Sequence, residues 1–246
     1  MSTPQKLRCQ VSKITDHGDH VYTVELAPER PVPRFKPGQF LHLTLEDYDS
    51  SSFWPESRVF SIASSPTQRD HLKISYSVKG KYTARMENEL QEGRTVWVKL
   101  PYGDFVIRDA GDVALLAGGT GITAFIAFID SLTDELHNRV LLAYGARKPE
   151  LLLYRESIDA RTRTNNGFHT LYFVETNDQN KIDATDSQKP EYLTGYLSLD
   201  AIWSRLANPQ ETTYYIAGPP AMIQVLTGNL LNKDISPEMI KIDAWE

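Results

Sequence analysis

Two short runs of the chain carry residue types suited to binding nucleotide cofactors. The run Arg58-Val59-Phe60-Ser61 offers a cation for a phosphate, an aromatic ring for stacking and a hydroxyl for hydrogen bonding. The run from Leu115 to Thr123 is an apolar strand that ends in a glycine-rich turn and opens a helix. Such a turn is typical of a pyrophosphate site. A flavin at the first run and a nucleotide at the second would together support oxidoreductase chemistry.

The glycine-rich turn consists of Gly118, Gly119, Thr120 and Gly121. Because its glycines lack Cβ atoms, a pyrophosphate can approach the backbone, where the N–H groups and the dipole of the helix start stabilise its charge. The strand before it and the helix after it are the context that this motif requires. The alternative interpretation is a tight turn with no ligand.

A second turn, Gly218-Pro219-Pro220, closes a later strand. Prolines suit the first turn of a helix, where no amide donor is needed. In an open α/β sheet, ligands bind beyond the carboxyl ends of the strands. This turn is therefore expected to share one crevice with residues 118–123. The alternative is a plain connecting loop.

A further anion site is predicted at Gly80-Lys81-Tyr82-Thr83, where backbone amides at the start of a helix are flanked by Lys79 and Arg85. The alternative is solvated surface charge, which is the usual state of lysine and arginine side chains. No Ser-His-Asp or Cys-His set in the sequence indicates a hydrolytic site.

Residues 6–108 contain short β-rich segments separated by turn residues, with one helical segment, Thr83–Leu90, for which Thr83 is the expected cap. Strands without long helices between them predict a small closed antiparallel barrel. The expected strands are Leu7–Ile14, Val21–Leu26, Gln39–Leu45, Val59–Ala63, Leu72–Val78 and Thr95–Leu100.

From Asp112 onward, strands alternate with helices, which predicts a parallel sheet with helices on both faces. The polar segment Asn177–Pro190 is expected to be a surface loop. The predicted organisation is two domains, a β-barrel in residues 1–110 and an α/β domain in residues 111–246. The expected strands of the second domain are Val113–Ala117, Val140–Tyr144, Phe168–Val174 and Thr213–Ala217, and the expected helices are Ile122–Leu132, Glu150–Ala160, Leu199–Leu206 and Ala221–Leu231.

The chain has 246 residues, a net charge of −6 and a single cysteine, Cys9. The negative charge argues against a nucleic-acid partner, and one cysteine cannot form an internal disulfide or ligate an iron–sulfur cluster. No metal site is expected, although His17 and His20 lie in one turn. The start, Met1–Arg8, is polar and no apolar run is long enough to cross a bilayer. A cytoplasmic protein without membrane insertion is therefore expected.

Seven motifs, in order along the chain, together resemble the ferredoxin–NADP reductase superfamily. The resemblance implies a Greek-key β-barrel that binds FAD, followed by an α/β domain that binds NADH or NADPH on a parallel sheet. The motifs are Pro37-Gly38-Gln39-Phe40, Arg58-Val59-Phe60-Ser61, Gly80–Thr83, Pro101-Tyr102-Gly103-Asp104-Phe105, Gly118–Thr123, Tyr144-Gly145-Ala146-Arg147 and Ala217-Gly218-Pro219-Pro220.

The resemblance also implies roles for individual residues. Arg58 would pair with the flavin phosphate, Phe60 would stack on the isoalloxazine and Ser61 would hydrogen-bond its N5 edge. Trp245 would cover the other face of the flavin, and Thr120 would lie near the nicotinamide, so Ser61, Thr120 and Trp245 are the expected catalytic residues. Further flavin-binding residues would be Val59, Tyr76, Val78, Lys79, Gly80, Lys81, Tyr82 and Thr83, and further nucleotide-binding residues Gly118, Gly119, Gly121, Arg147, Glu175, Gly218 and Pro219.

Three positions depart from the common pattern of that superfamily. Ala217 stands where many members have a cysteine beside the nicotinamide, and Ala124 stands where they often have proline. The serine and arginine typical of NADP-users are replaced by Glu175-Thr176-Asn177-Asp178. A carboxylate accepts hydrogen bonds from a ribose 2′-hydroxyl and repels a 2′-phosphate. The sequence therefore favours NADH, with Arg147 as a partial offset.

The resulting hypothesis is an FAD-dependent NAD(P)H oxidoreductase that passes electrons to a separate acceptor protein, such as a ferredoxin, a flavodoxin or an oxygenase component. Residues 1–110 hold 15 basic and 14 acidic residues, whereas residues 111–246 hold 11 and 18. An acidic partner would therefore be received by local positive charge, near Lys79, Lys81 and Arg85, rather than by net charge.

Two alternatives stay open. One is an NAD(P)H:flavin reductase that releases reduced flavin, a branch which Ala217 and the ending Ile242-Asp243-Ala244-Trp245 resemble. The other is a non-catalytic regulatory subunit that binds flavin or nucleotide. Loss of the hydroxyl at the flavin edge would be expected for such a subunit, and Ser61 is retained.

Overall fold

The computed structural model describes residues 3–49, 51–108, 111–133, 138–175 and 190–243. It contains two compact units, one formed by residues 1–106 with 126–131 and the other by residues 107–125 with 132–246. None of the described helices has the length and apolar character needed to cross a membrane.

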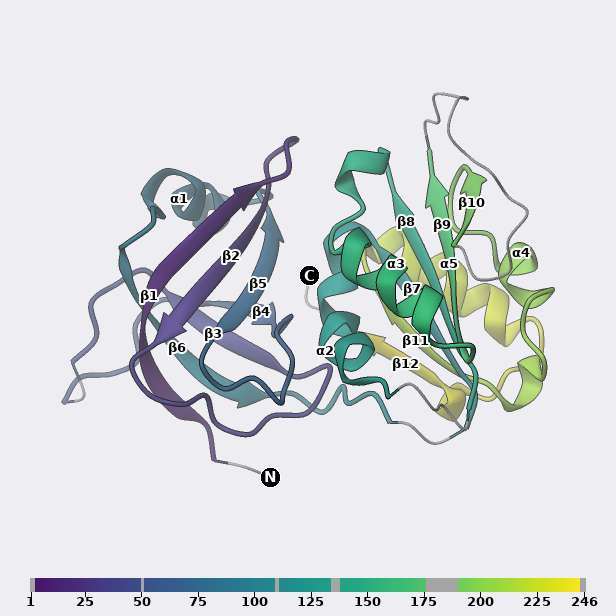
Figure 1. Ribbon diagram of the computed structural model, residues 1–246, viewed down its shortest axis with the longest axis horizontal. Helices are drawn as coiled ribbons and strands as arrows, with labels where there is room; N and C mark the ends of the chain where they lie inside the picture. The colour runs from purple at the N-terminus through teal and green to yellow at the C-terminus, as the bar shows by residue number, and fades with distance from the viewer. Residues whose placement is uncertain (1–2, 50, 109–110, 134–137, 176–189, 244–246) are drawn as a thin grey trace. The chain divides into compact units, whose positions relative to one another are not determined.

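The first unit is built on a six-stranded antiparallel sheet with the order β4-β3-β6-β1-β2-β5 (Figure 1). Its two end strands are joined where the backbone N–H of Ala63 donates to the carbonyl oxygen of Lys73 at 2.8 Å. The sheet therefore forms a nearly closed barrel, which confirms the predicted architecture. The strands are β1 (Gln5–Asp16), β2 (Val21–Pro28), β3 (Phe40–Thr44), β4 (Arg58–Ser61), β5 (Leu72–Ser77) and β6 (Thr95–Tyr102).

Alternation of side chains explains why these segments are strands. Along β1, Leu7, Cys9 and Val11 are buried and the residues between them are exposed, because successive residues of a strand point to opposite faces. The buried set joins apolar residues of the other strands in one core.

Helix α1 (Lys81–Glu89) buries Tyr82 and Met86, which lie on one side of the helix at i and i+4. The predicted cap, Thr83, is wrong, because Gly80 is the residue that precedes the helix. The Thr83 hydroxyl instead accepts hydrogen bonds from the backbone N–H groups of Lys79 at 3.0 Å and Gly80 at 3.1 Å. A hydroxyl in the first turn can reach back in this way, as in a capping box.

The second unit contains a six-stranded parallel sheet with the order β10-β9-β8-β7-β11-β12. The chain runs outward from β7 to β10 and then returns to place β11 beside β7, so the order reverses at β7 and β11. This confirms the predicted α/β architecture. The strands are β7 (Val113–Gly118), β8 (Val140–Ala146), β9 (Phe168–Val174), β10 (Glu191–Thr194), β11 (Thr213–Ala217) and β12 (Ile240–Asp243).

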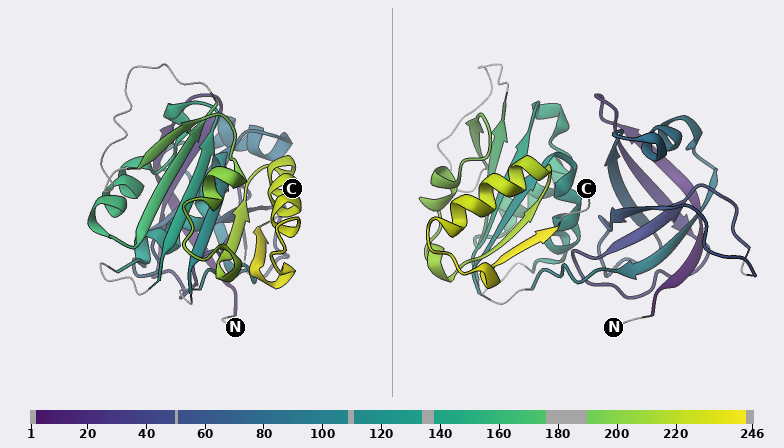
Figure 2. Two further views of the ribbon diagram at one scale, coloured as in Figure 1. Left: turned by 90° about the vertical axis from the view of Figure 1, so that its right-hand side faces the viewer. Right: turned by 180° about the vertical axis from the view of Figure 1, so that it is seen from behind.

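Different helices cover the two faces of this sheet. Figure 1 shows α3 in front of the strands, and Figure 2 shows α5 in front of them when seen from behind. Helices α4 and α5 share a core with one face of the sheet. The helices are α2 (Thr123–Ser131), α3 (Arg155–Thr164), α4 (Leu199–Trp203) and α5 (Pro220–Leu231), with 3₁₀ turns at Gly119–Ile122, Pro149–Leu151, Pro209–Glu211 and Pro237–Met239.

Three tyrosines line the α3 face of the sheet. Tyr144, Tyr172 and Tyr192 are in register on β8, β9 and β10, with ring centroids 6.2 and 5.0 Å apart. The Tyr172 hydroxyl donates to Asp159 of α3 at 2.7 Å. The Arg155 guanidinium lies 5.3 Å from the centre of the Tyr192 ring. The contacts of Asp159 and Arg155 attach α3 to the neighbouring strands β9 and β10.

Some predicted boundaries in the second unit were wrong. The helix predicted over 150–160 begins only at Arg155, because Tyr154 adopts a left-handed conformation at φ 59° and separates it from the 3₁₀ turn. Helix α4 ends at Trp203 rather than Leu206. Strands β10 and β12 were missed. In the loop predicted at 177–190, residues 177–189 lie outside the described residues.

Candidate functional site

The residues predicted to bind flavin lie on β4, β5 and the start of α1. Phe60 on β4 and Tyr76 on β5 have ring centroids 6.1 Å apart, although these strands stand at opposite ends of the sheet order. Val59, Phe60 and Ser61 are half-buried, and Tyr76 is buried. The barrel thus brings together an aromatic ring and the hydroxyl-bearing end of β4.

Arg58 is held at the start of α1 by Tyr82. Its guanidinium lies 5.0 Å from the centre of the Tyr82 ring. The Tyr82 hydroxyl donates to Leu43 at 2.8 Å and accepts from the Leu45 N–H at 3.2 Å. Burial raises the pKa of Tyr82, and the two bonds fix its ring. The Arg58 cation therefore lies beside the first turn of a helix, a combination that fits a phosphate group.

Several backbone amides at the predicted flavin site already have partners. The N–H groups of Lys79 and Gly80 are bonded to the Thr83 hydroxyl, and that of Val78 donates to His20 at 3.0 Å. The N–H groups of the first helical turn itself have no partner within a helix. Within the predicted anion site at residues 80–83, the backbone amides of Lys81, Tyr82 and Thr83 are those that could bind an anion.

Carboxylates around Arg58 and Arg85 were missed by the sequence analysis. Arg85 contacts Glu46 at 2.8 Å, Glu89 at 2.9 Å and Glu56 at 3.8 Å. Glu56 also lies 3.5 Å from Arg58. The hydrogen bond from Arg85 holds the pKa of Glu89 below its ordinary value. Arg85 is thus a paired cation, and its three carboxylate neighbours reduce the local positive charge that was expected beside α1.

In the second unit, the predicted nucleotide turns after β7 and β11 touch each other. Ala117 and Ala217 are paired across these strands. A Cβ added at Gly121 would overlap the carbonyl oxygen of Ala217 and lie 2.7 Å from the backbone nitrogen of Gly218. A Cβ at Gly118 would lie 2.9 Å from Pro219. The prediction that the two turns share one edge of the sheet is consistent with this packing.

Gly119 differs from the other glycines of this turn. Its φ is +53°, and a Cβ added to it would meet no atom within 4 Å. Thr120 follows it, half-buried, and accepts a hydrogen bond from the Thr123 hydroxyl at 2.8 Å through its carbonyl. Gly119 is therefore the position where the backbone faces open space at the reversal of strand order, and this fits an approaching pyrophosphate.

Arg147 and Glu175 lie at neighbouring strand ends of the same sheet. Both side chains are exposed, and the Glu175 N–H donates to the carbonyl oxygen of Ala146 at 3.2 Å. Glu175 and Arg147 therefore lie on adjacent strand ends at the carboxyl edge of the sheet. The remaining predicted residues Thr176, Asn177, Asp178 and Trp245 lie outside the described residues.

The two close histidines have separate partners. His17 contacts the Thr23 hydroxyl at 2.9 Å, and His20 contacts Glu87 at 2.7 Å. Within the part of the chain that the structure describes, no group of three or more His, Cys, Asp and Glu residues could hold a metal ion.

The chain is similar to known oxidoreductases. Residues 115–227 match the family described as the oxidoreductase NAD-binding domain. The chain is 27% identical over 240 residues to the reductase component of phenol 2-monooxygenase from Pseudomonas sp. (strain CF600), covering 93% of this chain and 64% of that protein. Residues 115–227 therefore match an oxidoreductase NAD-binding domain, and the chain as a whole resembles the ferredoxin–NADP reductase superfamily.

Other relatives combine this region with further sequence. The flavohemoprotein of Bacillus subtilis (strain 168) is 24% identical over 240 residues, which cover 96% of this chain and 58% of that protein. The FAD/NAD-binding domain of nitric oxide dioxygenase from Vibrio cholerae has the same fold, with a TM-score of 0.76, 18% identity and coverage of 96% and 97% of the two chains. The chain spans about three fifths of the length of the first curated relatives that it matches.

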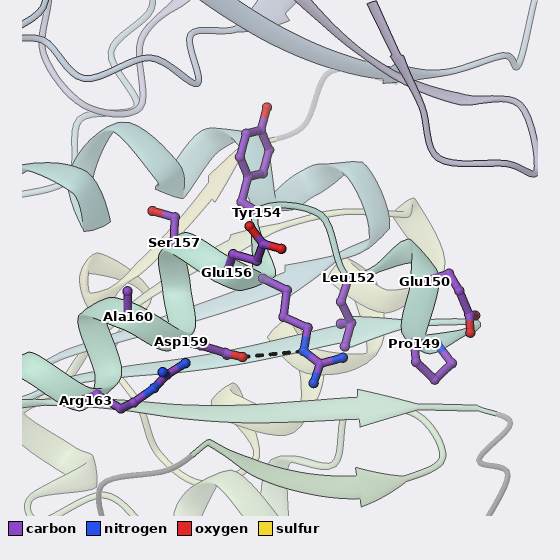
Figure 3. A pocket seen from close by; sticks show the side chains of 10 residues that line it. Pro149, Glu150, Leu152, Tyr154, Glu156, Ser157, Asp159, Ala160 and Arg163 are labelled. Atoms are coloured by element: carbon purple, nitrogen blue, oxygen red, sulfur yellow. Dashed lines mark ion pairs between the residues drawn. The ribbon is translucent and has the colours of Figure 1, made fainter. Parts of the chain in front are cut away.

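A hollow that the sequence did not predict lies along α3 and the turn before it (Figure 3). Its volume is about 760 Å³. Arg155 and Asp159 both line it and form an ion pair at 3.5 Å, which Figure 3 marks with a dashed line at Asp159. None of the described residues predicted to bind a cofactor lines this hollow. Its lining is Pro149, Glu150, Leu152, Tyr154, Arg155, Glu156, Ser157, Asp159, Ala160 and Arg163.

Proposed function

We propose that the chain is an FAD-dependent NAD(P)H oxidoreductase that transfers hydride from a nicotinamide to the flavin N5 and then electrons to a separate acceptor protein. The acceptor would be a ferredoxin, a flavodoxin or an oxygenase component. The observation that carries the proposal is the pair of touching turns after β7 and β11, with Gly119 open beside them. Similarity to the reductase component of phenol 2-monooxygenase supports it.

In this proposal the first unit binds and orients FAD. Arg58 and the first-turn amides of α1 hold the diphosphate, and Phe60 and Tyr76 contact the ring system. Ser61 gives a hydrogen bond at the N5 edge. When bound, the flavin supplies an N5 that accepts hydride and passes electrons on singly or in pairs. The chain's own contribution is orientation and electrostatics.

The second unit binds the nicotinamide nucleotide. The turn from Gly118 to Gly121 and the turn at Gly218-Pro219 receive its pyrophosphate, and Thr120 lies near the nicotinamide. Glu175 accepts hydrogen bonds from a ribose 2′-hydroxyl, which favours NADH over NADPH. Arg147 adds an opposite charge nearby. The proposal includes a protein partner and a cytoplasmic location.

A second candidate is an NAD(P)H:flavin reductase that releases its reduced flavin. The observation that favours it is the ion pair between Glu56 and Arg58 at 3.5 Å. A carboxylate beside the predicted phosphate ligand weakens the attraction for a diphosphate. A flavin held less tightly would exchange with solution.

The visible spectrum of the purified, desalted protein, followed by anaerobic addition of NADH or NADPH, tests the proposal. A yellow protein that bleaches supports retained FAD and hydride acceptance. A colourless protein that reduces added flavin supports the second candidate. Yellow protein that neither nucleotide bleaches contradicts both and supports a regulatory subunit.

The role of Ser61 is tested separately. In Ser61→Ala, flavin binding is expected to persist while flavin reduction slows by about 10²- to 10³-fold, the range for removal of one transition-state hydrogen bond. Stopped-flow absorbance of the flavin gives the rate. Ser12→Ala, on an exposed part of β1, is the matched control. An unchanged reduction rate in Ser61→Ala would remove Ser61 from the mechanism.

A further inference from the structure

Glu56 stands between two arginines at the predicted flavin-phosphate site. Its Oε1 lies 3.5 Å from Arg58 Nη2, and its Oε2 lies 3.8 Å from Arg85 Nη1. Both distances exceed the length of a direct charge-assisted hydrogen bond, which is about 2.7 to 2.9 Å. The Glu56 side chain is 57% exposed. The carboxylate therefore interacts with both cations and is held tightly by neither.

Arg85 is anchored independently of Glu56. It donates from Nε to Glu89 at 2.9 Å and from Nη2 to Glu46 at 2.8 Å. Glu89 in turn accepts from Arg94 at 3.0 Å. Loss of the contact between Glu56 and Arg58 would leave Arg85 in place. Glu56 would then keep one cationic neighbour.

Arg58 has no such set of carboxylate partners among the contacts described above. It contacts the Ser57 carbonyl at 3.0 Å, the Tyr82 ring and Glu56. An incoming phosphate must therefore compete with one carboxylate for this guanidinium. Arg85 provides the charge that receives Glu56 after the exchange.

We propose that Glu56 is an internal counter-ion that competes with the flavin phosphates for Arg58 and so sets how tightly the chain holds its flavin. The inference rests on the proposed function, which assigns Arg58 to the flavin phosphate. Glu56 is a specificity-determining residue in this scheme, because it weakens the binding of flavins that carry phosphate and leaves the binding of riboflavin unchanged.

The test is the dissociation constant of the flavin-free full chain for FAD, FMN and riboflavin, measured by quenching of flavin fluorescence. In Glu56→Gln, the constants for FAD and FMN are expected to fall by about two- to five-fold, the range that exposed ion pairs produce. The constant for riboflavin is expected to stay the same. Glu56→Ala should reproduce the result, and Glu29→Gln is the control for net charge.

Arg58→Gln separates failure of the inference from failure of the proposed function. The substitution is expected to weaken FAD binding. In the Arg58→Gln background, Glu56→Gln should no longer tighten FAD binding. If Arg58→Gln weakens FAD but Glu56→Gln changes nothing, only the counter-ion role is lost. A gain that persists without Arg58, or that extends to riboflavin, also overturns that role. Unchanged FAD binding in Arg58→Gln removes the assignment of Arg58 itself.

Discussion

Cys9 is the only cysteine of the chain, and its side chain is 2% exposed in the core of the barrel. Burial, with a smaller contribution from Glu29, raises the pKa of its thiol to about 12 from the ordinary value of 9.0. The thiolate is the reactive form of cysteine. The folded protein is therefore expected to hold this residue unreactive near neutral pH.

We predict that an aromatic disulfide reagent at pH 8 labels no thiol in the native protein and one thiol per chain in denaturant. Cys9→Ser is the control that abolishes the second signal. Since the folded pKa is raised, the thiol's contribution to stability is complete below pH 9 and declines as pH rises toward 12. Rapid labelling of the native protein at pH 8 would contradict the burial of Cys9.

Gly121 is tightly packed against the backbone of the neighbouring turn. Because a Cβ there would overlap Ala217 and crowd Gly218, Gly121→Ala is expected to lower the free energy of unfolding by about 1–3 kcal/mol through overpacking. Urea denaturation measures the change. Gly228→Ala is the matched control, since a Cβ there meets no atom within 4 Å in α5, and it should gain about 0.5–1 kcal/mol.

At the scale of elements, α3 is attached to the sheet by the hydrogen bond from the buried Tyr172 to Asp159. Burial and the neighbouring carboxylate of Asp159 raise the pKa of Tyr172. Tyr172→Phe is expected to lower the free energy of unfolding by about 1–3 kcal/mol, because it removes a hydrogen bond to a charged group. Thermal unfolding measures the loss. Asp159→Asn, which keeps an acceptor for the hydroxyl, should lose less, and equal losses would contradict the argument.

Element predictions succeeded where one segment carries its own signal. The β1 strand is visible in the alternation of Leu7, Cys9 and Val11, and β9 spans the predicted Phe168–Val174. The short strands β10 and β12 were missed because they exist only through pairing with β9 and β11. Helix α3 begins later than predicted because Tyr154 has a left-handed backbone conformation. Non-glycine residues rarely adopt this conformation, so the sequence does not indicate it.

The candidate sites were predicted unevenly for a related reason. Residues inside contiguous motifs, such as Arg58 and Gly118 to Gly121, could be named from the sequence. The carboxylates that surround the cations could not, because Arg85 and Glu46 are 39 residues apart and meet only through the fold. The explanation of the glycines by pyrophosphate approach was also incomplete. The absence of side chains at Gly118 and Gly121 also lets the two turns pack against each other.

At the scale of the whole molecule, the proposed function uses both units to oxidise the nucleotide, so coenzyme choice is tested on the complete chain. Glu175 is exposed at the carboxyl end of β9. In Glu175→Gln, the ratio of kcat/KM for NADPH to that for NADH is expected to rise by about ten-fold, which corresponds to about 1.4 kcal/mol. Loss of repulsion against a 2′-phosphate is the reason.

The measurement is anaerobic flavin reduction or steady-state turnover with each nucleotide. Glu238→Gln, on an exposed 3₁₀ turn, controls for the change in net charge. A ratio that stays constant in Glu175→Gln would place coenzyme discrimination elsewhere in the chain.

The contact between the turns after β7 and β11 has a practical meaning for protein engineering. Gly121 rests against Ala217 and Gly218, and Gly118 against Pro219 and Met222. A transplant of residues 118–121 alone into another scaffold would leave those glycines without their opposing surface. The smallest portable form of the proposed nucleotide site is therefore discontinuous, comprising both turns and the two adjacent strands that hold them in register.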